Sequence, residues 1–284
     1  MNRRRLVRVP ASSANLGPGY DAFAAALSIH LELEVEETGA FVVETQVKGV
    51  PRDRSNLCVR AFELLHPADG VTFRLRSDIP VAAGLGSSAA AIVAGLVAAD
   101  HMYELDADLL PLAVGLEGHP DNVAAALHGG FVICVDGRAE HFHMPAELEG
   151  VLAIPPHEVP TAKARAALPA EVPIEDAVHN IAHAGMLVLG LARGDLDLVS
   201  RGLSDRIHQA RRQSLYPRSM ELLQRARELG ALGATISGAG PAVLFWSHYE
   251  QTGSVYDELR AKAADCRVRR VQFDPSGADV RALA

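Results

Sequence analysis

The chain has 284 residues, of which 49% are hydrophobic and 22% charged. This composition supports a full-sized core in one large domain or two ordinary ones, and it excludes a disordered chain. The formal net charge of -8 lacks the basic excess that nucleic-acid binding needs, so no nucleic-acid partner is expected.

Four features bear on mechanism and compartment. The only lysines are Lys48, Lys163 and Lys262, and none stands in a Walker A or protein-kinase motif, which excludes those nucleotide-binding designs. The three cysteines form no Cys-x-x-Cys pair, which favours a reducing, cytoplasmic compartment. No apolar export segment follows the N-terminal arginines. Residues 79–99 are uncharged, but their first third is loop-like, so we expect a buried helix and no membrane partner.

The first half of the chain predicts a mixed α+β region. Apolar and acidic residues alternate at 29–36, which is typical of a strand with one face in the core. The same period recurs at 41–47 and 71–75, and we expect these strands to be antiparallel because buried parallel strands are continuously apolar. The remaining expected elements are a short strand before Pro10–Asp21, a helix of small residues after it, helices from about Ser87 and at 106–116, and a strand at 130–135.

The second half predicts another α+β lobe. A short strand at 151–154 precedes helical patterns at 161–167, 174–192, 196–203 and 219–229. Two strands joined by a turn follow around 233–246, and then a helix near 255–264 and a strand at 268–273. We place the boundary near Glu149, which gives domains at 1–149 and 150–284, although no linker marks it.

The segment Pro80–Ala90 runs into a helix whose first turns carry no acidic residue. Such a helix start offers unpaired backbone N–H groups and the positive end of the helix dipole. Its glycines allow close approach of a bulky anion, and Ser87 and Ser88 could cap the helix or ligate a metal ion beside phosphates. The residues alone leave two alternatives open, a phosphate cradle or a plain glycine turn with a serine N-cap.

The same residues also fit the dinucleotide fingerprint Gly-x-Gly-x-x-Gly/Ala, with Asp106 at a suitable interval. That fingerprint requires a preceding buried parallel strand, whereas residues 71–76 alternate like a half-exposed antiparallel strand. Asp106 also belongs to a helix start rather than to a strand end. The context therefore argues against dinucleotide binding.

Two further glycine-rich segments are present. Pro10–Asp21 carries more polar side chains than a turn needs, which suggests a site for a polar ligand. Ala234–Ala242 has the glycines of a hairpin turn and leads into an apolar strand.

Together, the three segments resemble those of the GHMP kinases. Pro80–Ala90 is similar to the Pro-x-x-x-Gly-Leu-Gly-Ser-Ser-Ala-Ala phosphate loop of that family, and Ser237–Pro241 to its C-terminal Ser-Gly-x-Gly-Pro motif. Pro10–Asp21, Glu117–Val123 and Gly129-Gly130 are similar to the homoserine kinase branch, since sugar and mevalonate kinases begin with a Gly-Glu-His type of motif. The departures are Tyr20 where Phe is usual, Phe23-Ala24 for Leu-Gly, and Ala242, which lacks the usual hydroxyl.

The resemblance implies an α+β, two-lobed fold, with an N-terminal lobe like ribosomal protein S5 and a ferredoxin-like C-terminal lobe. It implies that ATP phosphorylates the γ-hydroxyl of L-homoserine to O-phospho-L-homoserine, a step of threonine biosynthesis. A homodimer is a further expectation from the family.

The resemblance also implies the site residues. Asn15, Asp21, His119 and Asp121 would line the substrate site, where the two carboxylates suit the ammonium group. Arg165 and Arg212 would bind the carboxylate, with Arg211 as an alternative to Arg212. Ser88 and Glu117 would hold Mg²⁺. The residues expected to bind ATP are Asn56, Pro80, Val81, Ala82, Ala83, Gly84, Leu85, Gly86, Ser87, Ser88, Gly238 and Gly240.

The expected catalytic residues are Asp121, Asn122 and Arg212. Asn122 stands where some relatives have an aspartate, and an amide cannot accept the hydroxyl proton. Asp121 is expected to face the substrate ammonium, so we predict phosphoryl transfer without a dedicated base.

Other interpretations are weaker. His179 and His183 have helical i, i+4 spacing, but no His-Glu-x-x-His motif supports a zinc site there. A mevalonate or sugar kinase of the same family would give no reason for two carboxylates beside arginines. A non-catalytic regulator that binds nucleotide or a metabolite is disfavoured by intact Ser88, Glu117 and Asp121.

Overall fold

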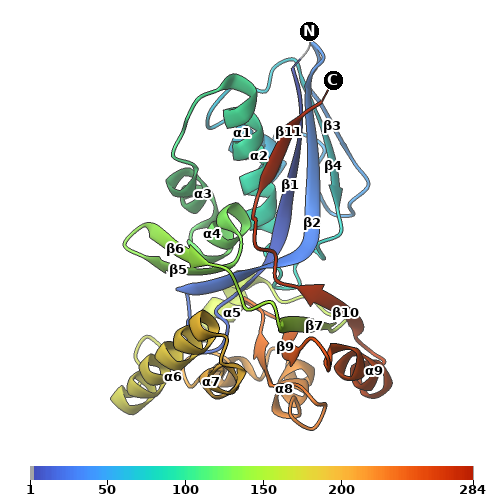
Figure 1. Ribbon diagram of the computed structural model, residues 1–284. Helices are drawn as coiled ribbons and strands as arrows, with labels where there is room; N and C mark the ends of the chain where they lie inside the picture. The colour runs from blue at the N-terminus through green and yellow to red at the C-terminus, as the bar shows by residue number, and fades with distance from the viewer. Residues whose placement is uncertain (1–2, 284) are drawn as a thin grey trace.

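A computed structural model describes residues 3–283, which form two lobes, each built on its own sheet (Figure 1). The first sheet has the order β11-β1-β2-β4-β3, and β5 and β6 extend it from β2. Its strands are β1 (Arg4–Ala14), β2 (Phe23–Glu37), β3 (Val42–Thr45), β4 (Val71–Ser77), β5 (Phe131–Val135), β6 (Arg138–Phe142) and β11 (Asp279–Ala282).

Helices cover one face of this sheet. They are α1 (Leu57–Phe62), α2 (Ser87–Tyr103), α3 (Leu109–Glu117) and α4 (Asp121–His128). Helix α2 is the central one, because its alanines and aliphatic side chains are buried on nearly every side between the sheet and the other helices. The structure confirms the expected loop at 80–86 followed by this helix. Within residues 3–283, no helix combines the length and the apolar character needed to cross a bilayer.

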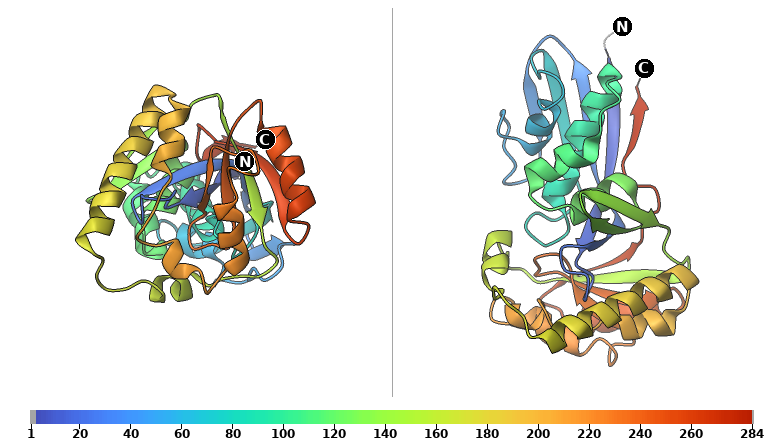
Figure 2. Two further views of the ribbon diagram at one scale, coloured as in Figure 1. Left: turned by 90° about the horizontal axis from the view of Figure 1, so that it is seen from below. Right: turned by 90° about the vertical axis from the view of Figure 1, so that its left-hand side faces the viewer.

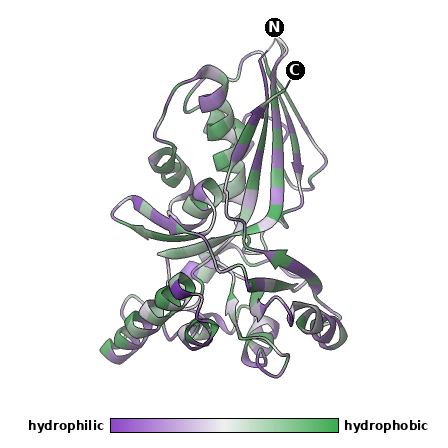
Figure 3. Ribbon diagram, in the orientation of Figure 1, coloured by the Kyte–Doolittle hydropathy of each residue, from purple (hydrophilic) through white to green (hydrophobic). Residues whose placement is uncertain are grey.

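Strands β1 and β2 show why the alternating pattern forms a sheet. Val7, Val9, Leu31 and Leu33 point into the core, whereas the charged residues between them lie on the open face. Purple and green bands alternate along both strands in Figure 3. On the open face, Glu34 accepts from both Arg4 and Arg74, so the charges there are paired across strands.

The second sheet has the order β10-β7-β9-β8, with all its neighbours antiparallel. Its strands are β7 (Leu148–Ile154), β8 (Gly233–Ile236), β9 (Val243–His248) and β10 (Arg267–Gln272). The helices of this lobe are α5 (Thr161–Ala166), α6 (Ile174–Arg193), α7 (Leu196–Gly202), α8 (Pro217–Gln224) and α9 (Thr252–Lys262). In Figure 1, α6, α7 and α8 lie beneath the sheet, whereas α5 lies higher, near the first lobe. These elements confirm the order predicted for the second half, except that the helix predicted at 219–229 ends at Gln224.

Two predictions for the first half are wrong. The helix expected after Asp21 is part of β2, because the small residues 24–26 are fully buried between β1 and β5 and pair with both strands. Tertiary pairing overrides their helix propensity. Strand β3 runs parallel to β4 instead of antiparallel. The long connection between them, which contains α1, returns the chain to the same end of the sheet, as a parallel pair requires.

The division of the chain at residue 149 stays a prediction. After β10 the chain leaves the second sheet, and β11 pairs antiparallel with β1 in the first sheet. The two views in Figure 2 show this final strand beside the first one. The C-terminal segment therefore connects the two lobes a second time.

Candidate active site

The candidate site is a cavity of about 390 Å³ to which both lobes contribute side chains. It brings together segments that are far apart in sequence, and it contains nearly all of the predicted residues. Those that line it are Asn15, Asp21, Asn56, the whole loop 80–88, Glu117, His119, Asp121, Asn122, Arg165, Arg212 and Gly238. Of the predicted residues, Gly240 is not among the lining residues.

The loop 80–86 is shaped by backbone conformation. Gly84 and Gly86 have φ values of +80° and +66°, in the left-handed region that favours glycine. Gly86 is the N-cap of α2, and no side chain caps this helix start. The serine N-cap considered above is therefore wrong, and the backbone N–H groups of the first turn are left for a ligand.

The third glycine-rich segment supports this loop from behind. Ser237 Oγ donates to the carbonyl of Gly84 at 2.7 Å, and the Ala242 amide donates to the carbonyl of Ala83. A Cβ atom on Gly84 would lie 2.3 Å from the Ser237 carbonyl oxygen and 2.8 Å from that of Gly240. Gly240 thus packs against the back of the loop, which explains why it does not line the cavity.

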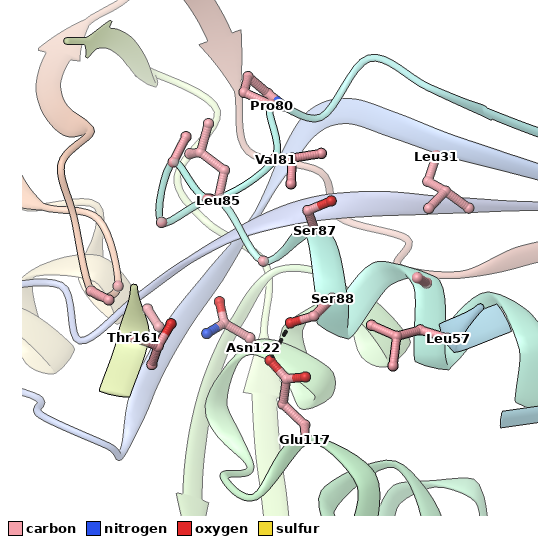
Figure 4. Close-up of a pocket in the computed structure, with 18 of the residues that line it drawn as sticks. Leu31, Leu57, Pro80, Val81, Leu85, Ser87, Ser88, Glu117, Asn122 and Thr161 are labelled. Atoms are coloured by element: carbon pink, nitrogen blue, oxygen red, sulfur yellow. Dashed lines mark hydrogen bonds between the residues drawn. The ribbon is translucent and has the colours of Figure 1, made fainter. Parts of the chain in front are cut away.

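Ser88 and Glu117 meet at the start of α2. Ser88 Oγ donates to Glu117 Oε1 at 2.6 Å, as the dashed line in Figure 4 shows. Burial raises the pKa of Glu117, although the Ser88 hydrogen bond and His119 act in the opposite direction. A buried carboxylate beside a hydroxyl is stabilised by a cation.

This pair fits Mg²⁺. The described part of the chain contains no cluster of three His, Cys, Asp or Glu side chains that could form a protein-only metal site. Mg²⁺ needs no such cluster, because it usually takes one or two protein oxygens and completes its shell with phosphate and water. Ser88 Oγ and Glu117 Oε1 are two such oxygens beside loop 80–86, so this pair would be able to hold the ion.

At the other end of the cavity, Asp21 and Arg165 form a bidentate ion pair, with Arg165 Nη1 and Nη2 2.8 and 2.7 Å from the two carboxylate oxygens. Asp21 has a φ of +56°, and its backbone amide donates to Asn15 Oδ1. Asn15 Nδ2 in turn donates to the carbonyl of Gly238. Asn15 therefore joins the first and third glycine-rich segments and positions the acid.

Arg212 and Arg211 point in different directions. Arg212 is 1% exposed, lines the cavity, and donates from Nε to the carbonyl of Ala164 and from Nη1 to that of Gly238. Arg211 is not among the lining residues and pairs with Asp176 on α6. The geometry favours Arg212 of the two alternatives.

Asp121 begins α4 and is only 2% exposed. Its Oδ1 accepts from the backbone amide of Asn122 at 2.7 Å and lies 3.4 Å from His119 Nδ1. The Asp121 carboxylate is the main cause that raises the pKa of His119. Asn122 Oδ1 accepts from Ser12 Oγ at 2.8 Å, which fixes the orientation of its amide in the cavity (Figure 4).

Asn56 lies at the apolar end of the cavity, where Leu31 and Leu57 also line the wall (Figure 4). Its side chain is already engaged, because Oδ1 accepts from the Cys58 amide at the start of α1 and Nδ2 donates to the carbonyl of Pro51. The apolar walls suit a planar base, and Asn56 holds the loop that carries part of that wall.

Sequence reasoning missed three residues around the site. Thr161 lines the cavity from the start of α5 (Figure 4), and Tyr20 lines it beside Asp21. Ser12 positions Asn122. Their signals were weak, because a hydroxyl at a helix start or in a strand is common, although Tyr20 stands out as a departure from the family pattern.

The two histidines on α6 lie outside this cavity. His179 and His183 stack with ring centroids 3.7 Å apart, and His179 Nε2 lies 3.0 Å from Ser204 Oγ. The ring stacking and the contact with Ser204 are among the contacts that the structure shows for this pair.

Comparison with known proteins identifies the family. Residues 56–130 match the GHMP kinases N terminal domain, and residues 187–265 match the GHMP kinases C terminal domain. A homoserine kinase of Moorella thermoacetica is 41% identical over 84% of this chain and 86% of its own length. One from Deinococcus radiodurans is 38% identical over 95% of each chain.

Solved structures agree. A homoserine kinase from Cytophaga hutchinsonii has a TM-score of 0.88 at 28% identity and covers 98% of this chain and 97% of its own. A mevalonate kinase with a TM-score of 0.74 covers 95% of this chain and 99% of its own, but at 13% identity it shows the fold alone. The comparisons confirm the expected two-lobed α+β fold. The chain therefore belongs to the GHMP kinase family, and it groups there with the homoserine kinases.

Proposed function

We propose that the chain transfers the γ-phosphoryl group of ATP to the γ-hydroxyl of L-homoserine, and that ADP and O-phospho-L-homoserine are the products. The observation that carries this proposal is the pairing within one cavity of a phosphate loop with an end built from carboxylates and arginines. A pocket for L-homoserine needs charges of both signs, because this zwitterion carries an ammonium group and a carboxylate. The activity would serve threonine biosynthesis.

Positioning supplies most of the catalysis in this proposal, since phosphoryl transfer passes through a loose transition state. The backbone of loop 80–86 and the start of α2 would hold the phosphates, and Ser88 and Glu117 would hold Mg²⁺. When bound there, Mg²⁺ neutralises phosphate charge. Asp21 and Asp121 would face the substrate ammonium, and Arg165 and Arg212 its carboxylate.

The reacting hydroxyl would lie beside Asn122, whose side-chain amide cannot accept a proton. The new bond forms between the hydroxyl oxygen and the γ-phosphorus, while the bond from that phosphorus to the bridging oxygen of ADP breaks. We propose that the hydroxyl proton passes to an oxygen of the transferred phosphoryl group and not to a side-chain base, since the Asp121 carboxylate would face the substrate ammonium and its Oδ1 already accepts from the backbone amide of Asn122.

A coupled assay for ADP release tests the proposal, with Mg-ATP and L-homoserine, L-threonine, L-serine, mevalonate or galactose. We expect L-homoserine to give the highest kcat/KM. Turnover of mevalonate or galactose above L-homoserine would identify another GHMP kinase activity. Binding of ATP without turnover of any acceptor would instead identify a regulator.

We further propose that the protein acts in the cytoplasm as a homodimer. Its three cysteines are free, which suits a reducing compartment. The dimer proposal is supported by α6, where Ile174 and Ile181 are 80% and 72% exposed along one outward face. Sedimentation of the wild type and of Ile181→Glu tests it, and a monomeric wild type would refute it.

A further inference from the structure

Tyr20 lies between the two arginines of the cavity. Its ring centroid is 5.7 Å from Arg165 Cζ and 5.4 Å from Arg212 Cζ, so both guanidinium groups lie within cation–π distance. On another side the ring contacts His208, with centroids 5.3 Å apart. The ring is therefore held in place by three neighbours, and its hydroxyl has a defined position in the cavity wall.

The Tyr20 hydroxyl has one hydrogen-bond partner in residues 3–283, and that partner is a donor. Arg165 Nη1 donates to Tyr20 Oη at 3.1 Å, so the oxygen accepts and its own hydrogen is left over. Burial is the first cause that raises the pKa of Tyr20, followed by the Asp21 carboxylate. The hydroxyl is thus protonated at neutral pH and has a hydrogen to donate into the cavity.

The two arginines have few donors left for a substrate. Arg165 already gives both terminal nitrogens to Asp21, and Arg212 gives Nε and Nη1 to backbone carbonyls. A carboxylate has about four lone-pair positions to satisfy. The arginine N–H groups that have no hydrogen-bond partner within residues 3–283 belong to Arg165 Nε and Nη2 and to Arg212 Nη2. The Tyr20 ring lies beside both guanidinium groups, so its hydroxyl adds a neutral donor at the place where a carboxylate would meet them.

We propose that Tyr20 is a specificity-determining residue for the α-carboxylate of the amino-acid substrate, to which Tyr20 Oη donates while its ring holds Arg165 and Arg212 in place. This inference rests on the proposed function, because it assigns the ligand of that same cavity. It predicts that the Tyr20 hydroxyl matters only for acceptors that carry a carboxylate.

The test compares Tyr20→Phe with the wild type on two acceptors. L-Homoserine carries the carboxylate, whereas L-homoserinol has a hydroxymethyl group in its place and keeps the ammonium and the reacting hydroxyl. We expect Tyr20→Phe to raise KM and Kd for L-homoserine roughly 10- to 100-fold, which is typical of a lost hydrogen bond to a charged group. We expect kcat for L-homoserine to change less than about threefold, and likewise KM and Kd for L-homoserinol. A neutral hydroxymethyl group loses much less binding energy than a carboxylate when this hydrogen bond is removed.

The control is Tyr249→Phe, which should change neither constant. It removes an exposed hydroxyl whose hydrogen-bond partner within residues 3–283 is the neighbouring Glu250. Equal losses on both acceptors would show a merely structural role for Tyr20 and overturn the inference, as would no loss on either. Kd is measured by calorimetry independently of turnover. A wild type that binds L-homoserine without phosphorylating it would refute the proposed function alone, and one that does neither would refute both.

Discussion

The two ends of the cavity are built by different means. At the phosphate end, the shape comes from backbone: positive φ values at Gly84 and Gly86, a helix start without a side-chain cap, and one serine–glutamate contact. At the amino-acid end, the shape comes from side chains of several segments, with Arg165 paired to Asp21 and Arg212 bonded to two carbonyls. The first end is built mainly on one continuous segment, 80–88, to which Glu117 is added, whereas the second is assembled from segments that only the folded chain brings together.

This difference has a physical consequence. A site made of backbone N–H groups and a helix dipole attracts any phosphate and depends on conformation, so it fails when the backbone moves. A site made of charged side chains selects a particular charge pattern and depends on each partner. Substitutions at the first end should therefore lower kcat, and substitutions at the second should mainly raise KM for the acceptor.

The largest loss is expected at the phosphate end from Gly84→Ala. The added Cβ would lie 2.3 Å from the Ser237 carbonyl oxygen, and the φ of +80° is strained for alanine. The loop must shift, and we expect kcat/KM for ATP to fall about 10³-fold in steady-state assays. Gly115→Ala is the matched control, because nothing lies within 4 Å of its Cβ position on α3. Gly84→Ala activity within tenfold of wild type would contradict a backbone-built site.

Glu117→Gln should lower kcat about 10²-fold, because it removes the carboxylate proposed to hold Mg²⁺ while keeping an acceptor for Ser88. The same substitution should raise the free energy of unfolding at neutral pH, although it lowers activity. Burial raises the pKa of Glu117, so the folded state binds this proton more tightly than the unfolded chain, and stability falls as the pH rises through the raised pKa.

Thermal unfolding measured against pH checks this second effect. Glu117→Gln should have a higher Tm than the wild type at neutral pH, and the difference should disappear below a pH of about 4, where an ordinary carboxyl is protonated. A Tm that drops at neutral pH would show that Glu117 stabilises the fold and is not held there for function.

At the amino-acid end, Arg212→Lys and Arg211→Lys form a matched pair. Lysine cannot reproduce the guanidinium contacts of Arg212 with the carbonyls of Ala164 and Gly238. We expect KM for L-homoserine to rise on the order of 30-fold in Arg212→Lys, with a smaller change in kcat. Arg211 pairs with Asp176 outside the cavity, so Arg211→Lys should leave KM nearly unchanged. Reversed effects would assign the carboxylate to Arg211.

The same contrast explains what the sequence could predict. The glycine loop before α2 was predicted from the residues, because a tight turn of positive φ before a helix favours glycine. The assignment of residues 80–88 to ATP came from the resemblance to the GHMP kinases and stays a prediction. The small residues after Asp21 were wrongly predicted as a helix, because a run of alanines carries no alternation of polar and apolar side chains that would indicate a strand. Arg212 could not be separated from Arg211 by sequence, since the direction of each side chain is set by partners that are distant in sequence, the carbonyls of Ala164 and Gly238 for Arg212 and Asp176 for Arg211. The proposed donation from Tyr20 to a substrate carboxylate could be inferred only from the structure, because only the folded chain places both arginines beside the Tyr20 ring.

The smallest expected effect on kcat comes from Asp121→Asn, which tests whether the Asp121 carboxylate takes the proton of the reacting hydroxyl. The variant keeps an acceptor oxygen for the Asn122 amide but removes the charge proposed to face the substrate ammonium. We expect KM for L-homoserine to rise about tenfold and kcat to fall by less than about tenfold. Steady-state kinetics at saturating Mg-ATP separate the two constants. A loss of general-base catalysis would instead lower kcat by about 10²- to 10⁴-fold with KM unchanged, and Asp121 would then be the base.

The Asp121→Asn variant should also lower the pKa of His119, because the Asp121 carboxylate is the main cause that raises it. An NMR titration of His119 checks that the substitution acts through charge and leaves the geometry of α4 intact.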